Sequence, residues 1–302
     1  MSNPKVTVLM SVFNGSCHLG EAVKSILSQS FVDFELLIID DGSSEPISEL
    51  INCFGDDRIR LLTQDNMGLT RSLNKGLELA RAEYVARMDA DDVCLPDRLE
   101  KQYEIISSSA KPDLVGTFFE IIDETGQSVQ KKSLITNPIY RLWRLLFHNN
   151  YGHGTIMFKK SSVIRAGMYD TRLRFAQDFD LWSRISKRNN THMIPEFLYK
   201  YRMNTAGEQA SVKNYDDQLQ AAIWISNRNL RSCNPKLKDQ DLIDLRSLYW
   251  EFQLPEVSQK APKLARDTLA EFFNRYGLDD CERRDLRIRV EFDLMGHEKS
   301  FS

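Results

Sequence analysis

The chain has 302 residues, of which 42% are hydrophobic and 27% are charged, so it can bury a full core as one large domain or as a domain with an appendage. Its net charge of -3 gives no reason to expect a nucleic acid partner. The five cysteines lack CxxC spacing, which favours free thiols in a reducing compartment, and no stretch approaches the ~18 apolar residues of a membrane span. We therefore expect a globular, cytoplasmic protein.

The first half of the chain alternates apolar strands with amphipathic helices. Strands are expected at residues 6–12, 34–39, 58–62 and 84–88, and helices at 18–28, 47–54 and 68–82. This order predicts an α/β fold, Rossmann-like, with a mostly parallel sheet and helices on both faces. In such sheets, ligands bind outside the carboxyl ends of the strands.

Polar clusters come directly after three of these strands. Asn14 comes after the first strand, Asp40 and Asp41 after the second, and Asp89 and Asp91 after the fourth. Because side chains at i and i+2 of an extended segment share a face, Asp89 and Asp91 should point the same way, about 7 Å apart at their Cα atoms. Oxygen ligands suit Mg²⁺ or Mn²⁺, which usually serve phosphate chemistry. The clusters predict one site at one edge of the sheet.

The same acidic residues also have simpler interpretations. Residues 89–92 could form a solvated loop in which Asp92 caps the helix that begins near Pro96. Asp40 and Asp41 could form an Asx turn with the two residues after them. Only the convergence of the three clusters favours a functional site.

The second half is more mixed. Strands are expected at residues 113–122, 154–158 and 192–201, helices at 139–147 and 177–187, and a helical pattern from about 212 to the end. This change of pattern predicts two regions. The first is an α/β domain over residues 1–210, and the second is a helical C-terminal region over residues 211–302.

The chain resembles the family 2 glycosyltransferases in five segments that occur in the family's order. These segments are PKVTVLMSVFNG, FELLIIDDGS, DNMGLTRSLNKGLELARAEYVARMDADDVCLPDRLEKQ, GHGTIMFKKSSV and AQDFDLW. They span roughly residues 4–202. The resemblance implies a GT-A fold and an inverting transfer of a sugar from a UDP-sugar to a saccharide or lipid-linked acceptor. It also implies a divalent cation, Mn²⁺ or Mg²⁺, and a place in bacterial surface polysaccharide synthesis.

The resemblance also implies roles for the strand-end residues. Asp41 would accept a hydrogen bond from the uracil ring, with Asp40 as the less favoured alternative. Asp91 would ligate the metal, and Asp89 would hold the ribose or a metal-bound water. Asn14 is expected to contribute to the same nucleotide-sugar site.

Three further residues take roles with open alternatives. Asp178 matches the catalytic base, although Gln177 replaces the glutamate that usually precedes it, and a helix N-cap is the simpler role for Asp178. Arg71 would lie near the phosphates or on a solvated helix surface. His153 is either a turn residue or a neighbour of the acceptor or phosphates.

The implied mechanism is a single displacement at the anomeric carbon. Asp178 would take the proton of the acceptor hydroxyl as the bond forms. Two other functions remain open, a sugar nucleotidyltransferase and an inert nucleotide-sugar-binding module. The turn FNGSCHLGEA lacks the glycine-rich loop with lysine that a nucleotidyltransferase usually carries.

Two segments mix arginines with bulky apolar residues, as interfacial membrane helices do. One is residues 139–147, with Arg141 and Arg144, and the other is residues 283–295. A core-packed helix with a solvated basic edge is the simpler interpretation of each segment. The sequence predicts at most a weak peripheral contact with the inner membrane face.

Overall fold

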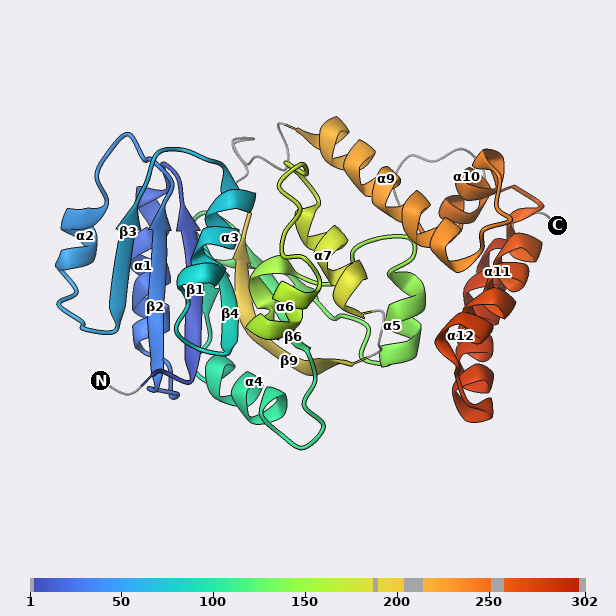
Figure 1. Cartoon of the computed structure of the whole chain (residues 1–302), viewed down its shortest axis with the longest axis horizontal. Coiled ribbons are helices and arrows are strands. Elements are labelled where there is room, and N and C mark those ends of the chain that lie inside the picture. The colour runs from blue at the N-terminus through green and yellow to red at the C-terminus, as the bar shows by residue number, and fades with distance from the viewer. Residues whose placement is uncertain (1–2, 187–189, 204–213, 251–257, 299–302) are drawn as a thin grey trace.

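The computed structural model describes residues 3–186, 190–203, 214–250 and 258–298 (Figure 1). Within them, a nine-stranded mixed sheet has the order β3-β2-β1-β4-β8-β6-β9-β5, and β7 pairs with β6. The strands are β1 Val6–Val12, β2 Phe34–Asp40, β3 Ile59–Thr63, β4 Tyr84–Asp89, β5 Val93–Cys94, β6 Leu114–Ile122, β7 Ser128–Lys132, β8 Met157–Lys159 and β9 Thr191–Arg202. As predicted, β1 to β4 are parallel.

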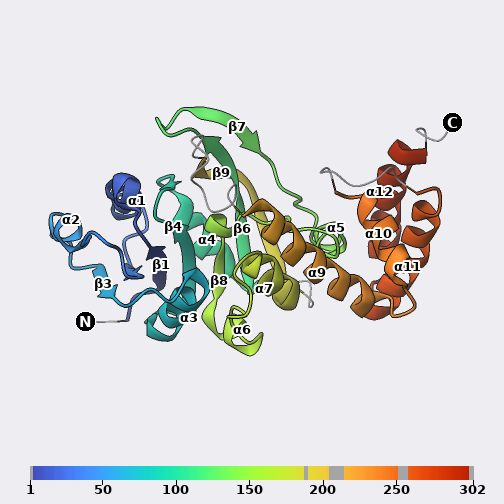
Figure 2. The ribbon, with the colours of Figure 1, turned by 90° about the horizontal axis from the view of Figure 1, so that it is seen from above.

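Helices cover both faces of the sheet and form the C-terminal region (Figures 1 and 2). They are α1 Ser16–Leu27, α2 Ser48–Asn52, α3 Leu69–Leu79, α4 Arg98–Ile106, α5 Pro138–Arg144, the 3₁₀ turn η1 His153–Thr155, α6 Lys160–Arg165, α7 Gln177–Ile185, α9 Tyr215–Cys233, α10 Asp239–Ser247, α11 Ala261–Tyr276 and α12 Asp280–Glu298. The predicted fold class, an α/β sheet domain with a helical C-terminal region, is confirmed.

The strand at the centre of the parallel part shows why the sheet forms. β1 is apolar along nearly its whole length because both of its faces are covered. Val8 and Met10 pack in one core with α1 and α4, whereas Leu9 packs in a second core with Leu73 and Leu77 of α3. The second core also contains side chains of α6 and α7.

A third core joins α5 to α9, α10, α11 and α12. Trp143 of α5 packs in this core against aromatic rings from other elements. The side chain is fully buried, packs edge-on against Phe272 of α11, and donates from Nε1 to the Tyr249 hydroxyl at 3.1 Å. Helix α9 links the cores, because Ile225 packs in the sheet core and Leu230 in the helical one. The boundary at residue 210 stays a prediction, and α5, from before it, is part of the helical core.

Two local predictions are wrong. Residues 154–158 do not form one strand, because His153–Thr155 make a 3₁₀ turn and β8 begins at Met157. The α5 helix does not carry a solvated or membrane-facing edge at Arg141, which is fully buried. Its guanidinium donates to the carbonyl oxygens of Ile135, Thr136 and Thr191. A charged group that is satisfied inside the fold cannot face a membrane.

Candidate functional site

The register of the parallel strands brings the predicted polar clusters to one sheet edge. Val12 lies opposite Asp40 on one side of β1, and Ser11 lies opposite Asp89 on the other. Residues 49 positions apart in sequence are therefore separated by a single strand. The carboxyl ends of β2, β1 and β4 form the floor of the candidate site.

Asp41 anchors the loop that leads into α3. Its buried carboxylate accepts hydrogen bonds from Gln64 Nε2 at 2.8 Å and from the backbone nitrogens of Met67 and Gly68 at 2.9 and 2.8 Å. Among the described residues, Oδ2 accepts only the bond from Gly68, so it keeps a lone pair for a ligand. Arg71, in the first turn of the helix that this loop begins, is exposed.

Asp40 and Asn14 shape the neighbouring loop. Asp40 Oδ1 accepts from the Ser43 nitrogen at 3.0 Å. This bond holds the turn after β2, but it reaches three residues along the chain, whereas the expected Asx turn would reach two. Asn14 Oδ1 accepts from the nitrogen and hydroxyl of Ser44 at 2.8 and 3.0 Å. These bonds tie the end of β1 to the end of β2.

The three carboxylates after β4 have different surroundings. Asp89 forms an ion pair with Arg87, an arginine buried within β4. Asp92 is fully buried and accepts from the Tyr199 hydroxyl at 2.6 Å and the Arg202 nitrogen at 2.7 Å. Asp91 is half-buried, and its carboxylate makes no hydrogen bond or ion pair with the described residues. Asp91 is therefore the carboxylate available to a ligand.

The prediction that Asp92 caps the next helix is wrong. Helix α4 begins at Arg98, after the N-cap residue Asp97, and Asp92 points into the protein instead. Burial, together with the negative charge of Asp91, raises the pKa of Asp92 to about 7. The residue holds β9 against the end of β4.

The acidic loop suits a divalent cation whose coordination is completed by oxygen atoms of the substrate. Within the described ranges, no group of three or more His, Cys, Asp or Glu side chains is arranged to hold a metal. Mg²⁺ is usually bound through one or two carboxylates, with phosphate oxygens and water in its other positions. Asp91 can supply the carboxylate that such an ion needs. Asp89, two residues before it, is paired with Arg87.

Asp178 lies in the first turn of α7, but Ala176 is the N-cap residue, so the N-cap role is wrong for Asp178. Its Oδ2 accepts from Asn149 Nδ2 at 2.7 Å, and its Oδ1 from the Phe179 nitrogen at 2.8 Å. Protein surrounds the carboxyl closely, although part of its surface still reaches solvent. Burial raises its pKa above the usual value, while these two donors and the positive charge of Arg87 oppose the rise.

His153 lies beside Asp89. The two residues line one cavity of about 270 Å³, together with Tyr199 and Tyr201 of β9. His153 Nε2 is 2.9 Å from the Tyr169 hydroxyl, and burial lowers the pKa of His153 well below 6.5, so the ring is neutral at pH 7.

Gly154 explains how β9 approaches so closely. A Cβ atom at this position would lie 2.1 Å from the Tyr199 hydroxyl oxygen, so only glycine leaves room for that ring. The same hydroxyl contacts Asp92, and the Asp89 nitrogen lies 3.2 Å from it. The close approach thus fixes the backbone of the acidic loop.

Sequence reasoning missed four residues of this site, namely Arg87, Asn149, Tyr199 and Arg202. Arg87 Nε is buried and has no hydrogen-bond partner among the described residues. Arg202 donates from Nε to the Asp91 carbonyl oxygen at 2.8 Å and so supports the acidic loop. A charged residue inside the apolar strand YVARMD was the available signal for Arg87.

The comparisons with known proteins agree with one another. The family model described as glycosyl transferase family 2 matches residues 7–166. The chain is 32% identical to the O-antigen biosynthesis glycosyltransferase WbnJ of Escherichia coli, over 70% of this chain and 84% of that protein. It is 33% identical to the amylovoran biosynthesis glycosyltransferase AmsE of Erwinia amylovora, over 65% of this chain and 75% of that protein.

The fold is also found among solved structures. The structure of S. aureus TarS 1-349 in complex with UDP-GlcNAc aligns with a TM-score of 0.63 at 14% identity, over 90% of this chain and 89% of that chain. At this identity the likeness shows the fold, and it includes most of the helical region.

Proposed function

Because this chain belongs to glycosyl transferase family 2, we propose that it transfers a sugar from a UDP-sugar to an acceptor hydroxyl with inversion. The chain is a glycosyltransferase with the GT-A fold, as the sequence predicted. Family membership favours a glycosyltransferase over the two alternatives, a sugar nucleotidyltransferase and an inert binding module. One observation carries the finer proposal: Arg87 forms an ion pair with Asp89, and its positive charge also acts to lower the pKa of Asp178.

The donor would lie over the carboxyl ends of β2, β1 and β4. Asp41 Oδ2 can accept from the uracil N3–H, whereas Asp40 already holds the turn after β2 through the Ser43 nitrogen. The exposed guanidinium of Arg71, in the first turn of α3, would interact with the phosphates. Asn14, which fixes the loop beside them, would shape the donor site.

Asp91 would hold Mg²⁺ or Mn²⁺ against the diphosphate. When bound there, the ion supplies positive charge that offsets the negative charge developing on the leaving group. Asp89 stays paired with Arg87 and would bind the ribose or a metal-bound water.

Asp178 would act as the general base for the acceptor hydroxyl. Its raised pKa makes it a stronger base than an ordinary aspartate, and Asn149 holds its carboxylate in one orientation. Attack from the side opposite the leaving UDP would convert an α-linked donor into a β-glycoside. No covalent sugar–enzyme intermediate is needed.

The names of AmsE and WbnJ support an acceptor in bacterial surface polysaccharide synthesis, a saccharide or a lipid-linked saccharide. None of the helices in the described ranges combines the length and apolar character needed to cross a membrane. Because Arg141 of α5 is buried, α12 is the helix better suited to a weak peripheral contact with a membrane. Its residues Ile288 and Phe292 are 63% and 73% exposed, and Arg284 and Arg287 lie on the surface nearby.

The proposal is tested by UDP release across a panel of UDP-sugars, with and without Mn²⁺. We expect Asp91→Asn to cut the rate about 100-fold or more, because metal stabilisation of the leaving group is worth several kcal/mol. Asp97→Asn is the matched control, since Asp97 is exposed and its side chain makes no capping bond. Full activity in EDTA, or equal rates in the two variants, would contradict the metal role.

A further inference from the structure

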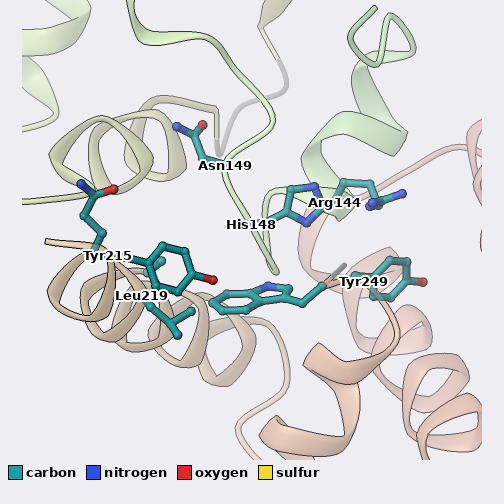
Figure 3. A pocket seen from close by; sticks show the side chains of 9 residues that line it. Arg144, His148, Asn149, Tyr215, Leu219 and Tyr249 are labelled. Carbon is teal, nitrogen blue, oxygen red and sulfur yellow. The ribbon is translucent and has the colours of Figure 1, made fainter. Parts of the chain in front are cut away.

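A second cavity opens between α5, α9 and α10, and Asn149 lies in its wall. It has a volume of about 390 Å³, within the ~300–1,000 Å³ that small-molecule sites occupy. Figure 3 shows Tyr215 and Leu219 projecting from α9, with His148 and Asn149 across the space from them. Six of the nine residues that line the cavity, Tyr215 among them, lie beyond residues 7–166, which the family model matches.

The cavity wall is aromatic. Tyr215 and Trp250 contribute rings to it, Tyr249 borders it from the third core, and Tyr215 is exposed. Aromatic rings offer broad apolar faces and, in tyrosine and tryptophan, a polar group at the edge. A pyranose ring has the complementary character, with apolar C–H faces and hydroxyl groups around its rim.

The wall also carries polar atoms that lack partners. His148 Nδ1 and Arg144 Nε are buried, and neither has a hydrogen-bond partner in the part of the chain that the structure describes. Leaving such a group unsatisfied costs about 1–3 kcal/mol. Both atoms are covered by protein, so a ligand would bond to them only after the two side chains turn toward the cavity. Burial and the neighbouring charge of Arg144 lower the pKa of His148 to about 4. A neutral imidazole beside a guanidinium suits hydroxyl groups, which both donate and accept.

Asn149 connects this cavity to the candidate catalytic base. Its side chain lines the cavity, and its Nδ2 donates to Asp178 Oδ2 at 2.7 Å. A ligand seated against Asn149 is thus one side chain away from the carboxylate that would deprotonate the acceptor. This places the cavity on the acceptor side of the site.

We infer that the cavity between α5, α9 and α10 binds a pyranose ring of the acceptor saccharide, through the rings of Tyr215 and Trp250 and the side chains of Arg144 and His148. The inference rests on the proposed function, because it takes Asp178 as the base. It gives the helical region a role in choosing the acceptor.

The test uses the full chain and p-nitrophenyl α- and β-glycosides of glucose, galactose, mannose and N-acetylglucosamine as probes. Their binding is measured by saturation-transfer NMR and titration, and their use as acceptors by UDP release. We expect Tyr215→Ala to weaken binding of the best glycoside and raise its KM about 5- to 10-fold, the loss expected for one aromatic contact. Tyr215→Phe should restore most of the affinity, and the KM for the UDP-sugar should change less than twofold in both variants.

Trp224→Ala is the matched control. Trp224 is an exposed aromatic residue on the same helix, but it lines a different surface hollow, beside Arg228. Unchanged glycoside binding in Tyr215→Ala, an equal loss in Trp224→Ala, or no binding of any glycoside to the wild-type chain would overturn the inference. Failure of the proposed function is seen separately, as a wild-type chain that releases no UDP from any donor even with water as acceptor.

Discussion

Asp178 and Asp180 occupy the first turn of the same helix, yet their neighbours give them different tasks. Asp180 is almost fully buried and forms ion pairs with Arg184 and with Arg228 of α9. A buried carboxylate between two arginines is held in one position. Asp178 instead accepts from two neutral donors, Asn149 Nδ2 and the Phe179 nitrogen, and keeps some access to solvent, which leaves it able to exchange a proton.

We expect Asp178→Asn to lower the transfer rate about 10²- to 10⁴-fold, the usual contribution of a general base, with little change in UDP-sugar affinity. Because the pKa of Asp178 is raised, the ionised form is disfavoured by folding, so the variant should be as stable as the wild type or more so above that pKa. Transfer assays, calorimetric titration of the donor and thermal unfolding measure the three quantities. Lost donor binding with an intact residual rate would move Asp178 to the donor site.

The pH profile gives a second check on Asp178. A base works only when ionised, so activity should be present above its folded-state pKa and fall as the pH drops through it. Since that pKa is raised, the acidic limb of the wild-type profile should lie above pH 3.8, the ordinary value for aspartate. A limb at or below that value would contradict the assignment.

At the scale of elements, helix α3 lies unusually close to β1. A Cβ atom on Gly76 would lie 2.2 Å from Leu9 Cδ1, and Leu9 is packed in the core. Gly20 of α1 is also within a helix, but a Cβ there would meet Leu50 at 3.8 Å, an ordinary contact. Close packing against Leu9 therefore favours glycine at position 76, whereas no comparable contact restricts position 20.

The two positions predict opposite effects of alanine. Gly76→Ala should lower the free energy of unfolding by about 1–2 kcal/mol, because overpacking outweighs the gain in helix propensity. Gly20→Ala should raise it by about 0.5–1 kcal/mol, because only the propensity changes. Urea unfolding of both variants checks the signs, and stabilisation by Gly76→Ala would show that α3 can move away from β1.

At the scale of the whole molecule, the helical region extends away from the sheet (Figures 1 and 2). Its last helix, α12, buries Leu286, Val290 and Leu294 in the third core. The opposite face leaves Ile288 and Phe292 exposed. This face is the part of the described chain that best suits the proposed weak contact with a membrane.

We expect a minor fraction of the protein to float with phosphatidylglycerol-containing vesicles at low salt. Phe292→Asp should abolish that fraction, because the change places a charge where an apolar ring would enter the interface. Val129→Asp, a change at an exposed apolar residue of β7, should leave it unchanged. Protein that stays wholly at the bottom of the gradient, or equal flotation of both variants, would contradict the contact.

The sequence by itself determined the parallel strands β1 to β4 and the positions of the strand-end acids, but not the antiparallel pairs that make the sheet mixed. Buried parallel strands must be apolar on both faces, so β1, β2 and β4 are mainly apolar, and the residues directly after each of them must lie at the ligand-binding edge. That reasoning placed Asp40, Asp41, Asp89 and Asp91 without any knowledge of their neighbours.

Only the tertiary structure decided what each polar side chain does. The charge state and partners of a carboxylate depend on groups that the fold brings close from distant parts of the sequence. Asp92 meets Tyr199 from β9, and Asp178 meets Asn149 from the loop after α5. Arg141 is buried because the fold supplies carbonyl oxygens around it, whereas its local pattern suggested a surface position. Local periodicity reports which face of an element is apolar, but burial and hydrogen bonding arise from packing between elements, and these set the chemistry of the site.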